Sequence, residues 1–524
     1  MKVPEEIRKV ERPVNTIVED SGRDGPKRYS VRQRGIVKYV PGKNPQPHNG
    51  KVIGHIIDYR FVPIEDTHLS DESPKMLSYG SAALAKSVCE DIVDDLLSIF
   101  DPTIAYSIIA LALIRVIRPS TPLSRVSAHY YRTFTSVFFP GASVSLNSLH
   151  KLVDYLGKNE DCRKAFFLKR MQYVMAEHHV AIDGTLKQDN STVNDLSAFS
   201  YRARVKNTRE ISVIYAYDIE RMEPVCAQVF PGNCIDASAY SSFIRDNNID
   251  RGIIVADKGF PPGKIKNELE VRPNLHFLTP IKRNDVRIKD NDMLAFQGVL
   301  SGIDANVLYC KKQIKGGKFL YAFLDQSKAS LETKTFLAKA KLQDQFDLEK
   351  FNDKKDKFGL IVLESDQDLP PEVSYLCYED RWKLELVFKY YKLDEDLDRT
   401  RVQGDFAVIG SEFVNFISTL ITCRIINKAQ KAGVLKEMSY GEMMDDLSSA
   451  WRRTDAPKSK PASDDAYWVH TLNNVMETLE KLELSVPIPK PEPKKRGRKP
   501  KPVDPNDIKP KRPRGRPRKV EVSQ

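Results

Sequence analysis

Residues 377–392 read CYEDRWKLELVFKYYK, and this stretch decides the fold that the chain is expected to adopt. On a helix, four of its polar residues share one face at steps of three, four and seven: Tyr378, Arg381, Glu385 and Lys392. Such a face could hold a metal ion through the carboxylate and phosphates through the two cations. Alternatively, Glu385 forms ordinary surface ion pairs with the basic residues four positions before and after it. The helix alone favours this second interpretation.

The excess of positive charge is concentrated at the C-terminal end of the chain. The 524 residues are enough for two to four domains, and 41% hydrophobic with 29% charged residues is typical of a soluble globular protein. The net charge is +11, but residues 485–524 hold 14 Lys and Arg against 4 Asp and Glu, which leaves 68 against 67 elsewhere. A basic groove in the folded body must therefore arise from local segregation of charge.

The cysteines and apolar runs indicate a reducing compartment and no membrane partner. The seven cysteines form no CxxC and have no His nearby in sequence, so neither a disulfide framework nor a structural zinc site is indicated. The N-terminus lacks an apolar signal core. The most apolar run, residues 103–117, is shorter than the roughly 20 residues of a membrane span and contains Arg115. We expect it to be a buried helix.

Periodicity divides the first third of the chain. Residues 1–77 should form a small β-containing module, with β-like runs at 35–39 and 51–61. Residues 78–177 show a helical period interrupted by prolines, and we expect them to bind DNA ends. Four arginines could present a helix to a DNA groove, or could simply be solvated: Arg115, Arg118, Arg125 and Arg132.

The pattern of apolar and turn residues in 178–283 predicts, in order, a strand, a hairpin at 211–230, a helix, a strand, a helix and a strand. The first strand should end on Asp183, before Gly184, and the fourth on Asp257. Strand ends in α/β sheets are where functional sites collect, because the loops there are free to carry function.

The rest of the chain is expected to contain four parts. Residues 284–372 indicate a β-rich insertion with charged connectors, and residues 373–430 a return to the core with the Glu385 helix. Residues 431–484 are helical by period and could serve dimerisation, and residues 485–524 form a basic tail.

Three separate elements bring forward three acids, Asp183, Asp257 and Glu385. Two divalent cations about 4 Å apart need carboxylates from several backbone segments, and such a pair activates a hydroxyl for in-line attack on a phosphodiester. Each aspartate alone is more often explained by turn chemistry. The three acids together with the order of strands and hairpin are more specific evidence of a shared site, because that combination matches one fold.

The chain resembles the DDE-type transposases of bacterial insertion sequences, in the branch called insertion-sequence family four. The hallmark of that branch is Tyr, two residues, Arg, three residues, Glu, six residues and Lys, which residues 378–392 match at every spacing. The segments DGT at 183–185 and DKGF at 257–260 look like its two aspartate motifs. The resemblance spans roughly residues 178–430.

The resemblance implies an α/β RNase H-like core that uses Mg²⁺ or Mn²⁺, two ions per site. The implied activity is cutting at transposon ends and joining the 3′-hydroxyl to target DNA, within a homodimeric synaptic complex in the cytoplasm and nucleoid of a prokaryote. By motif position, Asp183, Asp257 and Glu385 would be the catalytic metal ligands. The residues that would contact DNA phosphates are Tyr378, Arg381 and Lys392.

Relatives with a hairpin mechanism stack an aromatic residue of the insertion on a flipped base. This insertion contains no Trp, and Trp382 lies in the helix instead, where it is a candidate for DNA contact. The aromatic residues Phe319, Tyr321 and Phe323 are expected in the core.

The tail contains RGRKP and PRGRP, which resemble AT-hooks of the DNA minor groove. The residues concerned are Arg496, Gly497, Arg498, Arg514, Gly515 and Arg516. A tail that binds any polyanion, or serves targeting, is the alternative. Under either interpretation the tail should be disordered without DNA.

Two other functions stay open from sequence. One is an RNase H-like nuclease without strand transfer, and the other is a DNA-binding architectural protein derived from a transposase.

Overall fold

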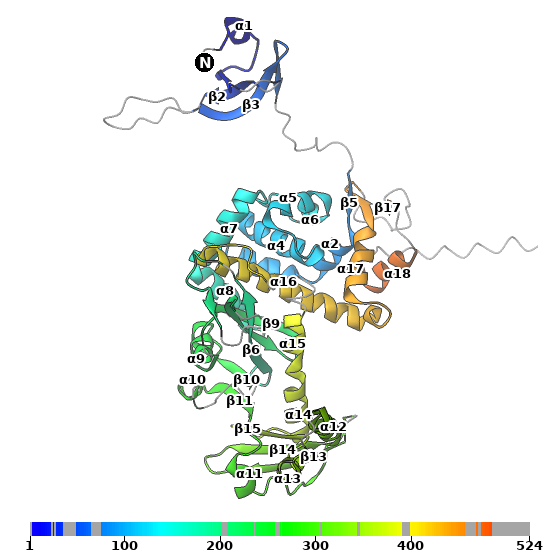
Figure 1. Ribbon diagram of the computed structural model, residues 1–524. Helices are drawn as coiled ribbons and strands as arrows, with labels where there is room; N and C mark the ends of the chain where they lie inside the picture. Colours follow the sequence, from blue (N-terminus) through cyan, green and yellow to red (C-terminus); the bar gives the residue numbers. More distant parts are fainter. Residues whose placement is uncertain are drawn as a thin grey trace, which may run out of the picture. The chain divides into compact units, whose positions relative to one another are not determined.

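A computed structural model describes residues 3–22, 25, 28–34, 49–63, 75–189, 191–200, 207–234, 236–256, 263, 265–303, 306–342, 346–389, 399–455, 468–469 and 473–484. It divides into two compact units, Met1–Lys75 and Met76–Gln524. Each unit is described by itself (Figure 1).

The first unit is a small antiparallel sheet in the order β1-β2-β3-β4, preceded by α1 (Glu5–Arg8). Its strands are β1 (Thr16–Asp20), β2 (Tyr29–Arg34), β3 (Asn49–Ile57) and β4 (Arg60–Pro63). The run 51–61, expected as one strand, is a hairpin, because Asp58 and Tyr59 take positive φ values of 47° and 56° and reverse the chain. The expected run at 35–39 lies outside the described residues.

The second unit begins with a helical region. Its helices are α2 (Gly80–Ser87), α3 (Glu90–Leu97), α4 (Pro102–Ile117), α5 (Leu123–Arg132), α6 (Thr135–Phe138), α7 (Leu146–Lys158) and α8 (Glu160–Met171). Helix α4 is the buried helix expected from the apolar run. Arg115 is only 8% exposed and bonds Ser411 and Asn415 of another helix, so the expectation that it faces a DNA groove or solvent is wrong.

Helix α16 (Asp405–Lys431) lies between these helices and the strands that follow (Figure 1). By length and composition alone it could cross a membrane, but 83% of its most apolar window is buried inside the fold, as in a core helix. Helix α16 packs closely on α7, because a glycine in each helix faces the backbone of the other helix. A Cβ at Gly410 would overlap the Val153 carbonyl oxygen, and a Cβ at Gly157 would overlap that of Phe406.

The central strands run in the order β11-β10-β6-β8-β9. They are β6 (His179–Gln188), β8 (Arg209–Asp218), β9 (Glu223–Pro231), β10 (Arg251–Ala256) and β11 (Asn274–Pro280), and the short β7 (Ala198–Phe199) joins the start of β8. β6, β10 and β11 are parallel, whereas β8 is antiparallel to both neighbours. The connections include α9 (Asp236–Asp246) and α10 (Lys266–Glu270). The expected RNase H-like mixed α/β fold is confirmed.

The insertion holds helices as well as strands. Its strands are β12 (Gly298–Val299), β13 (Val307–Gln313), β14 (Phe319–Asp325) and β15 (Leu360–Ser365), and its helices are α11 (Val286–Asp290), α12 (Gln326–Leu342) and α13 (Leu348–Lys355). The charged segment expected as a connector is α13, which has no buried residue. Through β15 the strands extend the main sheet next to β11. Tyr321 and Phe323 are buried.

The chain then returns to the core and ends among the first helices. The returning helices are α14 (Pro371–Asp380) and α15 (Trp382–Lys389). After α16 come η3 (Val434–Lys436), α17 (Tyr440–Ser449), β16 (Trp451–Arg453), β17 (Trp468–Val469) and α18 (Asn473–Lys481). β16 pairs with β5 (Met76–Ser78), so residues far apart in sequence share a small sheet.

Arg424 of α16 links three parts of this unit. Its guanidinium lies 2.6 Å from Glu223 of β9 and bonds Asp91 of α3. Burial by itself would raise the pKa of Glu223, but the hydrogen bond and charge of Arg424 outweigh it and lower this pKa below its usual value of 4.5. The same balance lowers the pKa of Asp91. This ionic cluster therefore stabilises the fold only while both carboxylates are charged.

Replacing Arg424 with Met should lower the free energy of unfolding near neutral pH by about 1.5–3 kcal/mol, because two partly buried carboxylates each lose one charged hydrogen-bond partner. Asp91 keeps its ion pair with Arg170, and Glu223 keeps its own with Arg221. The stability that depends on lowered pKa values is present above the unfolded-state pKa and is lost as pH falls through the folded-state values. The loss should therefore shrink on acidification. Urea unfolding at several pH values measures it. Arg245→Met, at an exposed ion pair, should change stability by about 1 kcal/mol or less. A pH-independent loss would contradict this account of Arg424.

Candidate catalytic site

Asp183 lies in the middle of β6. The pairing with β8 continues from Val180 to Gln188, so the expectation that the strand ends on Asp183 is wrong. Gly184 does not break the strand, because it keeps its place in the ladder opposite Ile214. An oxygen of the Asp183 carboxylate accepts a hydrogen bond from the Gly184 backbone at 2.8 Å.

The register of β6 and β8 fixes the face on which Asp183 projects. Asp183 is directly opposite Tyr215, and opposed residues of an antiparallel pair project from the same face. The Tyr215 ring packs on Phe388 of α15 at 5.7 Å and on Phe416 of α16 at 5.9 Å. Asp183 thus projects from the face that α15 covers, and α15 carries Glu385.

Asp257 lies outside the described residues. The described part of β10 ends at Ala256, which pairs in parallel with Ile182, the residue before Asp183. Lys392 and the six tail residues of the AT-hook-like motifs also lie outside the described residues.

The stretch expected as one helix is two, α14 and α15, which meet at Arg381. Arg381 keeps right-handed helical angles, and its backbone nitrogen still bonds the Cys377 carbonyl at 3.2 Å. Its guanidinium lies 5.6 Å from the Tyr378 ring centre and 3.6 Å from a Glu385 carboxylate oxygen. Glu385 is 60% exposed. The three described members of the charged face therefore lie together, and the surface ion pair of the alternative interpretation exists on the Arg381 side.

Trp382 is 48% exposed and lines a hollow of about 190 Å³. The hollow is shared with Tyr217 at the end of β8, Met222 before β9, and several residues of α16. An exposed indole beside a hollow can stack on a planar group.

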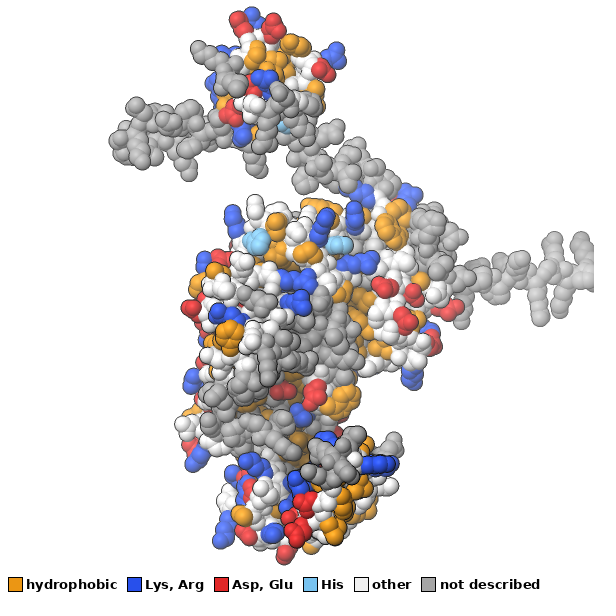
Figure 2. Space-filling view, viewed as in Figure 1, with side chains coloured by type: hydrophobic (Ala, Val, Ile, Leu, Met, Phe, Trp, Pro, Cys, Tyr) orange, Lys and Arg blue, Asp and Glu red, His pale blue; other side chains and the backbone are white. Residues whose placement is uncertain are grey.

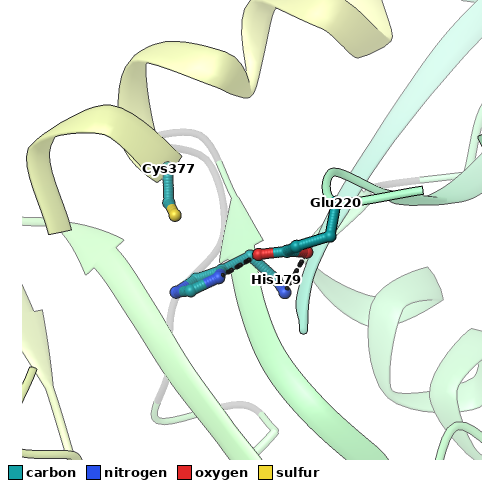
Figure 3. Close-up of side chains that lie close together, drawn as sticks. All are labelled: His179, Glu220 and Cys377. Carbon is teal, nitrogen blue, oxygen red and sulfur yellow. Dashed lines mark hydrogen bonds and ion pairs between the residues drawn. The ribbon is translucent and has the colours of Figure 1, made fainter. Parts of the chain in front are cut away.

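Sequence reasoning missed a cluster of ligand-type side chains at the start of β6 (Figure 3). His179 donates its backbone nitrogen to Glu220 at 2.8 Å, and its Nδ1 lies 2.7 Å from the other Glu220 oxygen. The Cys377 sulfur lies within 4.8 Å of ligand atoms of both. Beside them, His178 bonds Asp218 at 2.7 Å. These groups could hold a metal ion, and they join α14 to the sheet.

The cysteine of this cluster is buried, and its thiol is neutral when no cation is bound. Burial, followed by the charges of Glu220 and Asp380, raises the pKa of Cys377 to about 12, so its thiol is protonated at neutral pH. The members come from three distant segments with no Cys–His spacing, and only the adjacent His178 and His179 gave any signal in sequence.

Comparisons with known proteins identify one domain of this chain. Residues 177–409 match the family model described as "Transposase DDE domain". Among curated proteins there is no match. A structure described as "Cryo-EM structure of piggyBac transposase synaptic complex with hairpin DNA (SNHP)" is similar at 10% identity and a TM-score of 0.38, over 71% of this chain and 80% of that chain.

A structure described as "Mos1 transposase paired-end complex with left transposon end" is similar at 12% identity and a TM-score of 0.14, over 30% of this chain and 54% of that chain. At these scores neither likeness defines the fold, which is established by the strand order above. The family match covers Asp183, Asp257 and Glu385. Residues 177–409 of the chain therefore form a DDE-type transposase domain, which is an enzyme domain.

Proposed function

We propose that this protein is a DNA transposase that cuts at transposon ends and joins the freed 3′-hydroxyl to target DNA. The observation that carries the proposal is the family match at 177–409, which includes the three acids and the complete Tyr-Arg-Glu-Lys spacing. The shared face of Asp183 and the Glu385 helix supports it. The spacing further supports membership of the insertion-sequence family four branch.

Two Mg²⁺ ions would be held by Asp183, Asp257 and Glu385, and Mn²⁺ would substitute for them. Carboxylate oxygens are the ligands that these hard cations prefer, and the exposed Glu385 carboxylate is open to a ligand. When bound, the pair supplies activation of the attacking oxygen and stabilisation of the leaving oxygen.

The neighbouring side chains would bind and orient the DNA. Arg381, held against Tyr378 and Glu385, would bind a terminal phosphate, as would Lys392. Trp382 would stack on a base at the hollow that it lines. Residues 78–177 would contact transposon ends, and residues 431–484 would serve dimer contacts in a synaptic complex. The protein would act on the DNA of a prokaryotic nucleoid.

Joining of element-end DNA to a target by the purified protein tests this proposal. A product that contains both DNAs supports strand transfer. Nicks without joining would instead support a nuclease, and binding without cleavage an architectural protein.

Deletion of residues 485–524 should weaken DNA binding and flatten its salt dependence. The slope of log affinity against log salt falls by about 0.9 for each phosphate contact that is lost. Affinity measured by fluorescence anisotropy at several salt concentrations gives this slope. An unchanged slope would mean that the tail does not touch DNA.

A charge-preserving variant separates the AT-hook from a general polyanion tail. It carries lysine at the four arginines of the two motifs: Arg496, Arg498, Arg514 and Arg516. Arginine fits the narrow minor groove of A·T tracts better than lysine, so a hook should lose its preference for A·T-rich duplexes. A polyanion tail should bind as before.

A further inference from the structure

A cationic pocket lies at the far end of β6 from His179. Four of its lining residues are positively charged, and no described residue that lines it is acidic: Arg115, Lys187, Arg399 and Arg401. Hydroxyl groups and one amide complete the polar lining, from residues 120 and 121 and from the first turns of α16. These are the donor types that bind phosphate oxygens.

The pocket has a buried floor and an exposed rim. The Lys187 side chain is 2% exposed and bonds Glu412 of α16 at 2.6 Å, and Arg115 bonds Ser411 of the same helix. Arg399 and Arg401 are exposed. Burial, and then the nearby Arg115 and Arg401, lower the pKa of Lys187 against the opposing effect of Glu412. Lys187 is paired with Glu412, whereas the other three cations that line the pocket face no acidic residue among its described lining, and a bound anion would be stabilised by their charge.

The positive charge continues from the rim over helix α5. Arg401 donates a hydrogen bond to the Ser120 carbonyl at 2.6 Å, which ties the rim to the segment before α5. The pKa of His129 in α5 is lowered, first by burial and then by the positive charge of three arginines that lie near it: Arg118, Arg132 and Arg125. Lys and Arg side chains gather over the helical part of this unit on the face shown in Figure 2. This continuity favours a long polyanion over an isolated small anion.

The pocket is also in line with the candidate catalytic site. Lys187 is four residues after Asp183, so the two side chains project from the same face of β6. At about 3.3 Å per residue their separation along the strand is about 13 Å. Phosphates of one DNA strand rise about 3.4 Å per nucleotide along the duplex axis, so about four nucleotides span this distance.

We propose that this pocket binds a backbone phosphate of the DNA about four nucleotides from the bond that is cut. The inference rests on the proposed function for the identity of its ligand, a DNA phosphodiester. Arg399 and Arg401 contact the phosphate at the rim, and the buried floor supplies the positive field.

The test replaces both rim arginines, Arg399→Gln and Arg401→Gln, and leaves the buried floor intact. DNA binding is measured against salt in Ca²⁺ buffer with an element-end duplex, and a thermal melt confirms that the variant folds. The slope of log affinity against log salt should fall by about one unit or more. The matched variant Arg245→Gln, at an exposed arginine of α9, should keep the wild-type slope.

A second arm locates the phosphate. Single neutral methylphosphonates are placed one at a time along the cleaved strand. Wild type should lose affinity at a position about four nucleotides from the cut, and the double variant should lose nothing further there. Equal losses in both proteins, or a wild-type slope in the double variant, would overturn the proposal.

A third arm uses inorganic phosphate as a competitor. Tight binding of phosphate to wild type, with no effect of the rim variant on DNA, would show a free-anion site and overturn the proposal. A failure of the proposed function can be told apart from a failure of this proposal. If the rim variant changes the slope but the wild-type protein never joins DNA, the phosphate pocket is supported and strand transfer is contradicted.

Discussion

Replacing Glu385 with Gln should lower the rate of DNA cleavage by about a thousandfold or more, equivalent to about 4 kcal/mol of transition-state stabilisation. The amide keeps the size of the side chain but removes the charge that would hold a metal ion. Glu385 is 60% exposed at the surface of α15, so the fold should not depend on it. Affinity for end DNA should stay close to wild type. Cleavage of a labelled end duplex in Mg²⁺ measures the effect, and Asp183→Asn should behave in the same way.

Glu372→Gln supplies the matched control for this variant. Glu372 lies in the first turn of α14, the helix before α15, and about two turns before Tyr378 at the start of the charged face. It should cleave DNA at the wild-type rate. Normal turnover by the Glu385 variant would remove Glu385 from the catalytic site, and with it the role assigned to the Tyr-Arg-Glu-Lys spacing.

Replacing Gly410 with Ala should destabilise the second unit by about 2 kcal/mol or more, although alanine is normally the better helix former. The added Cβ would overlap the Val153 carbonyl oxygen, and α7 must move away from α16 to admit it. Backbone atoms cannot turn aside as a flexible side chain can. Urea unfolding followed by circular dichroism measures the change.

Gly441→Ala is the control for the helix-propensity effect. Gly441 lies in α17, where an added Cβ has nothing within 4 Å, so this variant should be as stable as wild type or more stable by up to about 1 kcal/mol. Equal stability of the two variants would mean that α7 and α16 do not meet at Gly410.

Local patterns predicted the order of the core elements. The hairpin at 211–230 appears as β8 and β9, and the buried strand before Asp257 as β10, because alternation and β-branched runs specify strands locally. The end of β6 could not be predicted, since pairing with β8 holds Gly184 in the ladder. Helices α12 and α13 escaped detection because they are largely exposed, with few apolar residues in a regular period.

The candidate site was likewise predicted from the sequence only in part. Helical spacing placed Tyr378, Arg381 and Glu385 together, which needs no tertiary information. The face that Asp183 occupies depends on its pairing with Tyr215, which sequence alone did not supply. Arg115 was wrongly expected at the surface, because its polar partners lie on a helix about 300 residues later in the chain.

The most direct measurement of the central claim is a strand-transfer assay. Purified protein is incubated with Mg²⁺, a labelled duplex that carries the inverted repeats flanking the gene, and a supercoiled target plasmid, with the Glu385→Gln variant in parallel. We expect the label to become joined to the plasmid through the 3′-hydroxyl of the cut end, in Mg²⁺ or Mn²⁺, and only with wild type. Label that is bound or nicked but never joined to the plasmid would contradict the assignment of this protein as a transposase that performs strand transfer.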